Sequence, residues 1–196
     1  MIKMRARFIN EAINEPTEGL DAFMERLIDA YPKLESYRNR IEDFINKSDC
    51  KKIRFEHFNA AAGFSLFDGV VLNSGILRQF SSTKFLYSLF HEIAHQYQYK
   101  KYGEEKMYEF YIGEIPVEEL AKFMQSCEIT ADRFAIGKLK QLGFGWSGKG
   151  FYEDVPLSHF IKFIQEIRNK IKIEGITDYR NVSKFMYNYI KNHTGF

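Results

Sequence analysis

Apolar residues recur at helical spacing along most of this chain, and they alternate in strand fashion only between residues 51 and 73. The strand pattern covers residues 51–57 and one or two further strands in 63–73, with a turn at 67–69. Helical spacing marks residues 17–30, 33–47, 82–102, 104–111, 116–142, 156–173 and 179–192. The pattern therefore predicts an α+β fold that is mostly helical, with a small β-sheet ahead of the helix at 82–102.

The helix at 82–102 has clear signals at both ends. Ser81, Ser82 and Thr83 offer side-chain oxygens that can accept hydrogen bonds from the free N–H groups of a first helical turn. Lysines occupy the last turn, and Gly103 suits the residue that ends a helix. Because both ends are marked, the residues between them can be assigned to helix faces by their spacing.

The sequence His91-Glu92-Ile93-Ala94-His95 lies in the middle of this helix. Residues four apart stand above one another on one helical face, so both imidazoles can bind the same metal ion. The carboxylate of Glu92 projects near that face and can take a proton from a water molecule beside the metal. This arrangement is typical of zinc hydrolases. The alternative is that both histidines are partly buried polar residues on an amphipathic helix.

A catalytic zinc ion takes three protein ligands and leaves one position open. Glu128 is the best third candidate, because it lies beside the apolar stripe of the helix at 116–142, and a buried carboxylate needs a cation or a hydrogen-bond partner. Asp132 follows four residues later on the same face, where it can accept the second N–H of His91 and orient that ring. The alternative for both acids is a set of salt bridges with nearby basic residues.

Other residues compete for these roles. His159 would complete a three-histidine site, and it is also a candidate for a contact to the transition state, where such sites often place a hydrogen-bond donor. Glu114, Glu118 and Glu119 are closer in sequence to His95, but they look like the acidic residues that begin a helix. A tyrosine could supply the same donor; those in or just after the motif helix are Tyr97, Tyr99, Tyr102, Tyr108 and Tyr111.

A glycine-rich segment at 143–150 follows the helix that carries Glu128. Its spacing does not match the phosphate-binding loop G-x-x-x-x-G-K-[ST]. We interpret this segment as a connector, or as a lid in which Trp146 covers an apolar pocket.

At these positions the chain resembles the gluzincin metallopeptidases, which carry H-E-x-x-H on one helix and a glutamate ligand on a following helix. The matching residues here are His91, Glu92, His95, Glu128 and Asp132. Residues 128–135 also look like the E-x-x-A-[DN]-x-[FY]-A pattern of the small ImmA/IrrE-like and related minimal metallopeptidases. The resemblance covers roughly residues 60–142. It implies a zincin-like fold in which the small sheet packs on the motif helix.

The same resemblance implies a function. It implies one Zn²⁺ ion held by His91, His95 and Glu128, with Glu92 as the general base of a metallopeptidase that hydrolyses peptide bonds in a protein or peptide substrate. It also implies an edge strand at residues 69–73, along which an extended substrate can pair.

Two other functions stay open. A zinc-binding regulatory or partner-binding module with little proteolysis would carry the same ligands. A SprT-like DNA-associated protease shares H-E-x-x-H but uses a third histidine. A net charge of +2 without long runs of like charge makes nucleic acid an unexpected partner, because nucleic-acid surfaces are usually more basic and more clustered.

The composition limits the cellular location, the membrane contacts and the domain organisation that we expect. Cys50 and Cys127 do not make a disulfide framework, and no apolar run reaches the length of a membrane span. We therefore expect a cytoplasmic protein without a membrane partner. We expect one domain over residues 1–196, with a catalytic core at about 50–143 and a helical extension at about 151–196. The sequence leaves the oligomeric state open.

Overall fold

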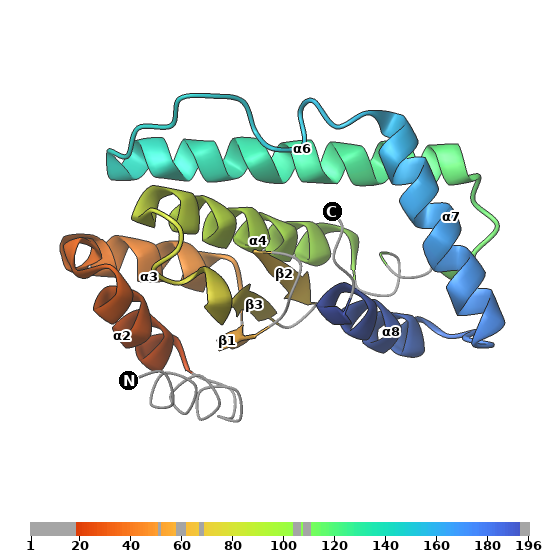
Figure 1. Ribbon diagram of the computed structural model, residues 1–196, viewed down its shortest axis with the longest axis horizontal. Helices are drawn as coiled ribbons and strands as arrows, with labels where there is room; N and C mark the ends of the chain where they lie inside the picture. The colour runs from red at the N-terminus through yellow and green to blue at the C-terminus, as the bar shows by residue number, and fades with distance from the viewer. Residues whose placement is uncertain are drawn as a thin grey trace.

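The computed structural model describes residues 19–50, 52–57, 62–66, 69–103, 107 and 111–192. Its helices are α2 (Leu20–Ala30), α3 (Arg38–Lys47), α4 (Ser82–Tyr102), α6 (Val117–Leu142), α7 (Leu157–Ile173) and α8 (Tyr179–Asn192), with short 3₁₀ helices η1 (Pro32–Tyr37) and η2 (Ser74–Ile76). Its strands are β1 (Lys52–Glu56), β2 (Gly63–Leu66) and β3 (Gly69–Asn73). The fold is α+β and mostly helical with one small sheet, which confirms the predicted class (Figure 1).

The sheet is mixed and has the order β1-β3-β2. β1 pairs with β3 in parallel, and β2 pairs with β3 antiparallel. Every residue of β3 is buried, as expected for a short apolar strand with neighbours on both sides. Because both edges of β3 are already paired, the prediction that residues 69–73 form an edge strand for a substrate is wrong. The edges of the described sheet are β1 and β2.

Helix α4 lies between the sheet and α6 (Figure 1). It contacts β2 and β3 on one side and runs antiparallel to α6 on the other. A helix covered on two sides needs apolar residues around most of its circumference. Residues 85–94 meet this demand, since all of them are buried. The first four residues of the histidine motif are therefore buried, and His95 is partly buried.

Two clusters of buried apolar side chains hold the elements together. The first joins α2, α3, the sheet, α4 and the C-terminal half of α6, with Phe23, Leu72 and Leu139 among its members. The second joins the N-terminal half of α6 to α7 and α8, with Leu120 and Phe160 among its members. Helix α6 belongs to both clusters and connects them. None of the helices in the described ranges combines the length and the apolar character that a membrane span requires.

The helix boundaries follow the capping signals of the sequence. Ser81 is the N-cap of α4, and its hydroxyl oxygen accepts a hydrogen bond from the N–H of Lys84 at 3.2 Å. Gly143 ends α6 in the left-handed conformation, with φ 84° and ψ 11°, which glycine adopts without steric cost. The pattern at 33–47 divides into η1 and then α3. Most of the helix predicted at 104–111 lies outside the described residues.

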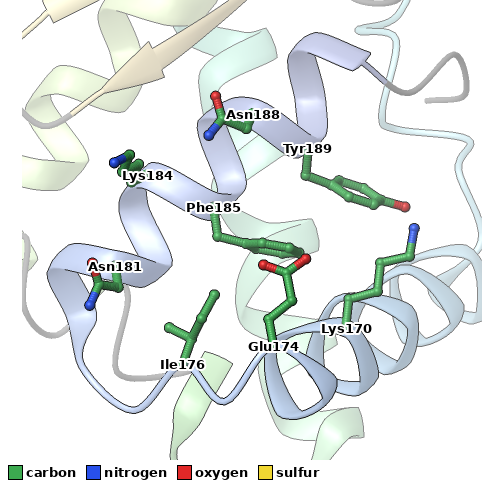
Figure 2. A pocket seen from close by; sticks show the side chains of 8 residues that line it. All are labelled: Lys170, Glu174, Ile176, Asn181, Lys184, Phe185, Asn188 and Tyr189. Carbon is green, nitrogen blue, oxygen red and sulfur yellow. The ribbon is translucent and has the colours of Figure 1, made fainter.

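A cavity of about 640 Å³ opens between α7 and α8, away from the histidine motif (Figure 2). It is lined by Lys170, Glu174, Ile176, Asn181, Lys184, Phe185, Asn188 and Tyr189. The ammonium group of Lys170 lies 4.3 Å from the centre of the Tyr189 ring, and the hydroxyl of Tyr189 donates to Glu166 at 2.6 Å. These contacts hold the two helices together. None of the residues predicted to carry chemistry lines this cavity.

The Phe85→Ala substitution tests the core beneath the motif helix. Phe85 is fully buried, and its ring lies 5.5 Å from that of Tyr31 and 6.0 Å from that of Phe55. We expect the substitution to lower the free energy of unfolding by about 3–5 kcal/mol, because it leaves a cavity in a packed interior. Urea unfolding followed by circular dichroism measures the change. Ile173→Ala is the matched control, since Ile173 is 83% exposed and its removal should change stability by less than about 0.5 kcal/mol. Equal midpoints for the two variants would contradict the packing described here.

Candidate metal centre

The structure brings together His91 and His95 from α4 and Glu128 from α6. One ligand atom from each residue lies within 4.8 Å of the others. The Nε2 atom of His91 is 3.0 Å from Oε2 of Glu128 and 3.2 Å from Nε2 of His95, and the distance from His95 Nε2 to Glu128 Oε2 is 3.6 Å. Two features cause this convergence. The histidines share one face of α4, and α6 packs along that face.

The hydrogen bonds on the far side of each imidazole decide which ring nitrogen carries a proton. Nδ1 of His91 lies 2.9 Å from Oδ1 of Asp132, and Nδ1 of His95 lies 2.8 Å from Oε1 of Gln98. Both of these oxygens can only accept, so both Nδ1 atoms must donate. In the neutral form of each ring, Nε2 then carries a lone pair that faces the other ring and the carboxylate of Glu128. Such a set of electron-pair donors repels itself without a cation, and it therefore fits a bound metal ion.

Asp132 is the fully buried carboxylate that supports His91. Besides His91 Nδ1, it accepts a hydrogen bond from the hydroxyl of Tyr87 and one from the backbone N–H of Tyr152 at 2.7 Å. Two donors from α4 and one from the loop after α6 satisfy a charge that would otherwise be costly to bury. The spacing of four residues from Glu128 had placed Asp132 in this role.

Gln98 supports His95 in a corresponding way, and the sequence patterns did not single it out. Its side-chain oxygen accepts from His95, and its side-chain nitrogen donates to the carbonyl oxygen of Cys127 at 2.9 Å. Gln98 thus links a histidine of α4 to the backbone of α6 next to Glu128. The signal that could have found it is its position three residues after His95, on the same side of the helix.

The segment after α6 packs against the centre. The backbone at Gly150 passes so close to Asp132 that a Cβ atom there would overlap the carboxylate side chain. The N–H of Phe151 donates to the hydroxyl of Tyr87 at 3.2 Å, and the ring of Trp146 stacks on the ring of Tyr87 at 4.2 Å. The glycine-rich segment is therefore a packed wall of the site, and glycine is needed at 150 by this close approach.

Tyr152 also belongs to the site. Its ring stacks on that of His91, with 5.5 Å between the ring centres and 28° between the planes. Sequence patterns could not find it, because it lies in a loop without periodicity, and its place depends on the path of the chain between α6 and α7.

Electrostatics show that the centre favours positive charge. Burial lowers the pKa of His91, but its hydrogen bonds to Asp132 and Glu128 outweigh that effect and raise the pKa to about 10. Burial alone would raise the pKa of Glu128, yet the charge of His95 and the hydrogen bonds from both histidines hold it well below its usual range. Burial raises the pKa of Glu92. Without a metal ion the site takes up protons instead, which is the behaviour expected of a cation site.

The competing candidates lie elsewhere. His159 is exposed in the first turn of α7 and is not among the residues whose ligand atoms converge. Its proposed contact to a transition state stays a prediction. Glu114, Glu118 and Glu119 are exposed before and in the first turn of α6, as their pattern suggested. Cys127 is buried, and burial raises the pKa of its thiol to about 12, which keeps it protonated.

A scan of protein-family models and searches of curated proteins and of solved structures find no match to this chain. The function of the site is therefore argued from its own geometry.

The Gln98→Leu substitution tests whether Gln98 orients a metal ligand. The leucine side chain has a similar volume but cannot accept from His95, so the imidazole loses the contact that fixes its proton on Nδ1. We expect the affinity for Zn²⁺ to fall about 10- to 100-fold, measured by competition with a chromophoric chelator. Gln165→Leu, at an exposed position of α7, is the matched control and should bind as the unmodified chain does. Unchanged affinity in the Gln98 variant would show that this hydrogen bond does not support the metal.

Proposed function

We propose that this chain is a zinc-dependent metallopeptidase of the gluzincin type, with Glu92 as its general base. The observation that carries the proposal is the environment of Glu92. This side chain is only 8% exposed, and within the described ranges its carboxylate has no hydrogen-bond or ion-pair partner. Its oxygens are not among the fully enclosed polar atoms without a partner, so they reach solvent beside the three ligands, where a mostly buried carboxylate can take a proton from a water molecule.

The donor set supports zinc as the metal. Two imidazole nitrogens and one carboxylate oxygen form a three-ligand set that leaves a position open, whereas structural zinc sites close all four positions with protein ligands. When bound, zinc would lower the pKa of a water molecule and polarise a substrate carbonyl. His91, His95 and Glu128 would hold the ion, and Asp132 and Gln98 would keep the two imidazoles in the required tautomer.

Glu92 would move the proton in this reaction. Its carboxylate accepts a proton from the water molecule as the water oxygen attacks the carbonyl carbon of the peptide bond. It then delivers that proton to the amide nitrogen as the carbon–nitrogen bond breaks. The products are a carboxylic acid and an amine, and Glu92 returns to its starting state.

The outer edge of β2, which pairs with no other strand of the described residues, supports a peptide as the substrate. The N–H of Asn73 donates to the carbonyl oxygen of Ala62 at 3.0 Å, and antiparallel strands alternate between bonded and non-bonded pairs. The main-chain groups of Gly63 and Ser65 therefore face away from β3. A Cβ atom at Gly63 would lie 3.1 Å from Cγ of Glu92, so this edge begins beside the general base. The carbonyl oxygen of Ser65 accepts from the hydroxyl of Tyr99 at 3.4 Å, so the main-chain groups of Gly63 are the ones with which an extended peptide would pair.

The two alternatives fit these observations less well. A SprT-like site takes a third histidine, whereas the third residue in the group here is Glu128 and His159 lies outside it. A regulatory or partner-binding module needs no general base. In such a module, the mostly buried carboxylate of Glu92 beside the metal ligands would have no chemical role.

Metal content is the first test. We expect about one zinc ion per purified chain, and a clear loss in Glu128→Ala, because one of three ligands is removed. Elemental analysis by mass spectrometry measures both. Glu25→Ala, at an exposed position of α2, is the matched control and should retain the metal. A chain that holds no zinc even after reconstitution would reduce His91 and His95 to packing residues.

Turnover is the second test. Glu92→Gln keeps the size of the side chain but cannot accept a proton, so we expect full zinc content and a fall in hydrolysis of about 10²- to 10⁴-fold. Fluorescently labelled casein and a randomised library of internally quenched peptides are the probes. Hydrolysis at an undiminished rate in this variant would overturn the role of Glu92. Zinc binding without any hydrolysis by the unmodified chain would favour the regulatory module.

A further inference from the structure

Gln96 of α4 joins the motif helix to two strands of the sheet. The residue is only 3% exposed. Its Nε2 atom donates a hydrogen bond to the hydroxyl oxygen of Ser65 in β2 and another, at 3.1 Å, to the carbonyl oxygen of Gly69 at the start of β3. A carboxamide nitrogen carries two hydrogens, so it can make both bonds at once. One side chain therefore fastens β2 and β3 to α4.

The proposed general base lies on the same face of α4. Glu92 precedes Gln96 by four residues, which places the two side chains above one another on the helix. Glu92 lies against Gly63, where a Cβ atom would be 3.1 Å from its Cγ, and Gln96 bonds to Ser65 two residues further along β2. Residues two apart in a strand share one side of the sheet. Helix α4 therefore meets β2 at two successive points, and Gln96 makes a side-chain hydrogen bond at the second.

Apolar packing does little to hold the first part of β2 in place. The strand has four residues, and within the described sheet it pairs with β3 alone. Of its first three residues only Phe64 has an apolar side chain, which is buried, while Gly63 has no side chain and Ser65 has a polar one. A segment with few buried apolar contacts opens more readily than the core. The bond from Gln96 therefore contributes strongly to the distance between β2 and Glu92.

We infer that Gln96 is a positioning residue, which holds β2 at the distance from Glu92 at which an extended peptide can pair with Gly63. This inference rests on the proposed peptidase function and deepens it. Gln96 touches neither the substrate nor the reacting atoms, and it acts through the backbone of β2. Its loss should weaken the binding of the peptide and leave the chemical step nearly unchanged, because the metal ligands and Glu92 all remain.

The Gln96→Leu substitution tests the inference, because leucine has a similar volume and cannot donate. The best-cleaved peptide of the quenched library is the substrate. We expect KM to rise about 10-fold while kcat changes less than about 3-fold. In the zinc-loaded Glu92→Gln background, the affinity for the same peptide, measured by fluorescence anisotropy, should fall to the same extent. Hydrogen exchange followed by mass spectrometry should show faster exchange of the backbone hydrogens of residues 62–66.

A second variant covers the case in which Gln96→Leu folds poorly. Ser65→Ala removes the acceptor in β2 and leaves the bond from Gln96 to Gly69, and Ser65 is only partly buried. We expect a smaller rise in KM in the same direction, with zinc content equal to that of the unmodified chain. An unchanged KM in both variants would overturn the inference. So would a fall in kcat at an unchanged KM, since it would assign the effect to the chemical step.

Gln125→Leu is the matched control. The Nε2 atom of Gln125 donates to the carbonyl oxygen of Val155 at 2.8 Å, so this glutamine on α6 makes a bond of the same kind away from β2. Its loss should leave KM and the exchange of residues 62–66 unchanged. An equal rise in KM in the control would show that any lost glutamine bond disturbs binding, and it would remove the special role of Gln96.

The remaining outcomes separate this inference from the proposed function. If the unmodified chain cleaves peptides, and Gln96→Leu speeds exchange in β2 without raising KM, only the role of Gln96 in peptide binding is overturned. If the zinc-loaded unmodified chain neither cleaves nor binds any peptide of the library, the peptidase function and the role of Gln96 in it are overturned together. Unchanged exchange of residues 62–66 in Gln96→Leu would overturn the inference whatever the activity.

Discussion

The buried carboxylate of Asp132 is the interaction on which the rest of the centre depends. It lies on α6 and accepts hydrogen bonds from Tyr87 and His91 of α4 and from the backbone of Tyr152 in the following loop. A fully buried charge is tolerated only when nearly all of its acceptor capacity is used. The need to satisfy this one group therefore fixes the distance between the two long helices and the path of the loop. It also explains why the loop has glycine at 150, where no side chain can fit.

The packing of α4, α6 and the following loop around Asp132 sets the positions of the metal ligands. His91 is oriented by Asp132, and His95 is oriented by Gln98, which also bonds to the backbone beside Glu128. Each imidazole is thus held at its Nδ1 atom and presents its Nε2 atom to the same point. Preorganisation of this kind means that little rearrangement is needed when a cation binds. The same close contacts lower the pKa of Glu128 and raise the pKa of His91.

The carboxylate of Glu92 lies beside this centre and has no hydrogen-bond or ion-pair partner among the described residues. Glu92 borders the start of β2, because a Cβ atom at Gly63 would lie 3.1 Å from its Cγ. A mostly buried carboxylate without a partner beside a metal-ligand set supports the proposed role of Glu92 as a general base.

Sequence alone determined the helices and the identity of the motif residues. The spacing of apolar residues and the capping signals predicted α4 and α6, and the four-residue spacings placed His91 with His95 and Glu128 with Asp132. These properties are local, because a helix repeats every few residues and its faces can be read from the chain. Only the tertiary structure decided that β3 is the central strand, that β1 and β2 are the edges of the described sheet, and that Tyr152 reaches His91. These features depend on contacts between segments that are distant in the chain, and neither strand order nor loop path has a local period from which it could be predicted.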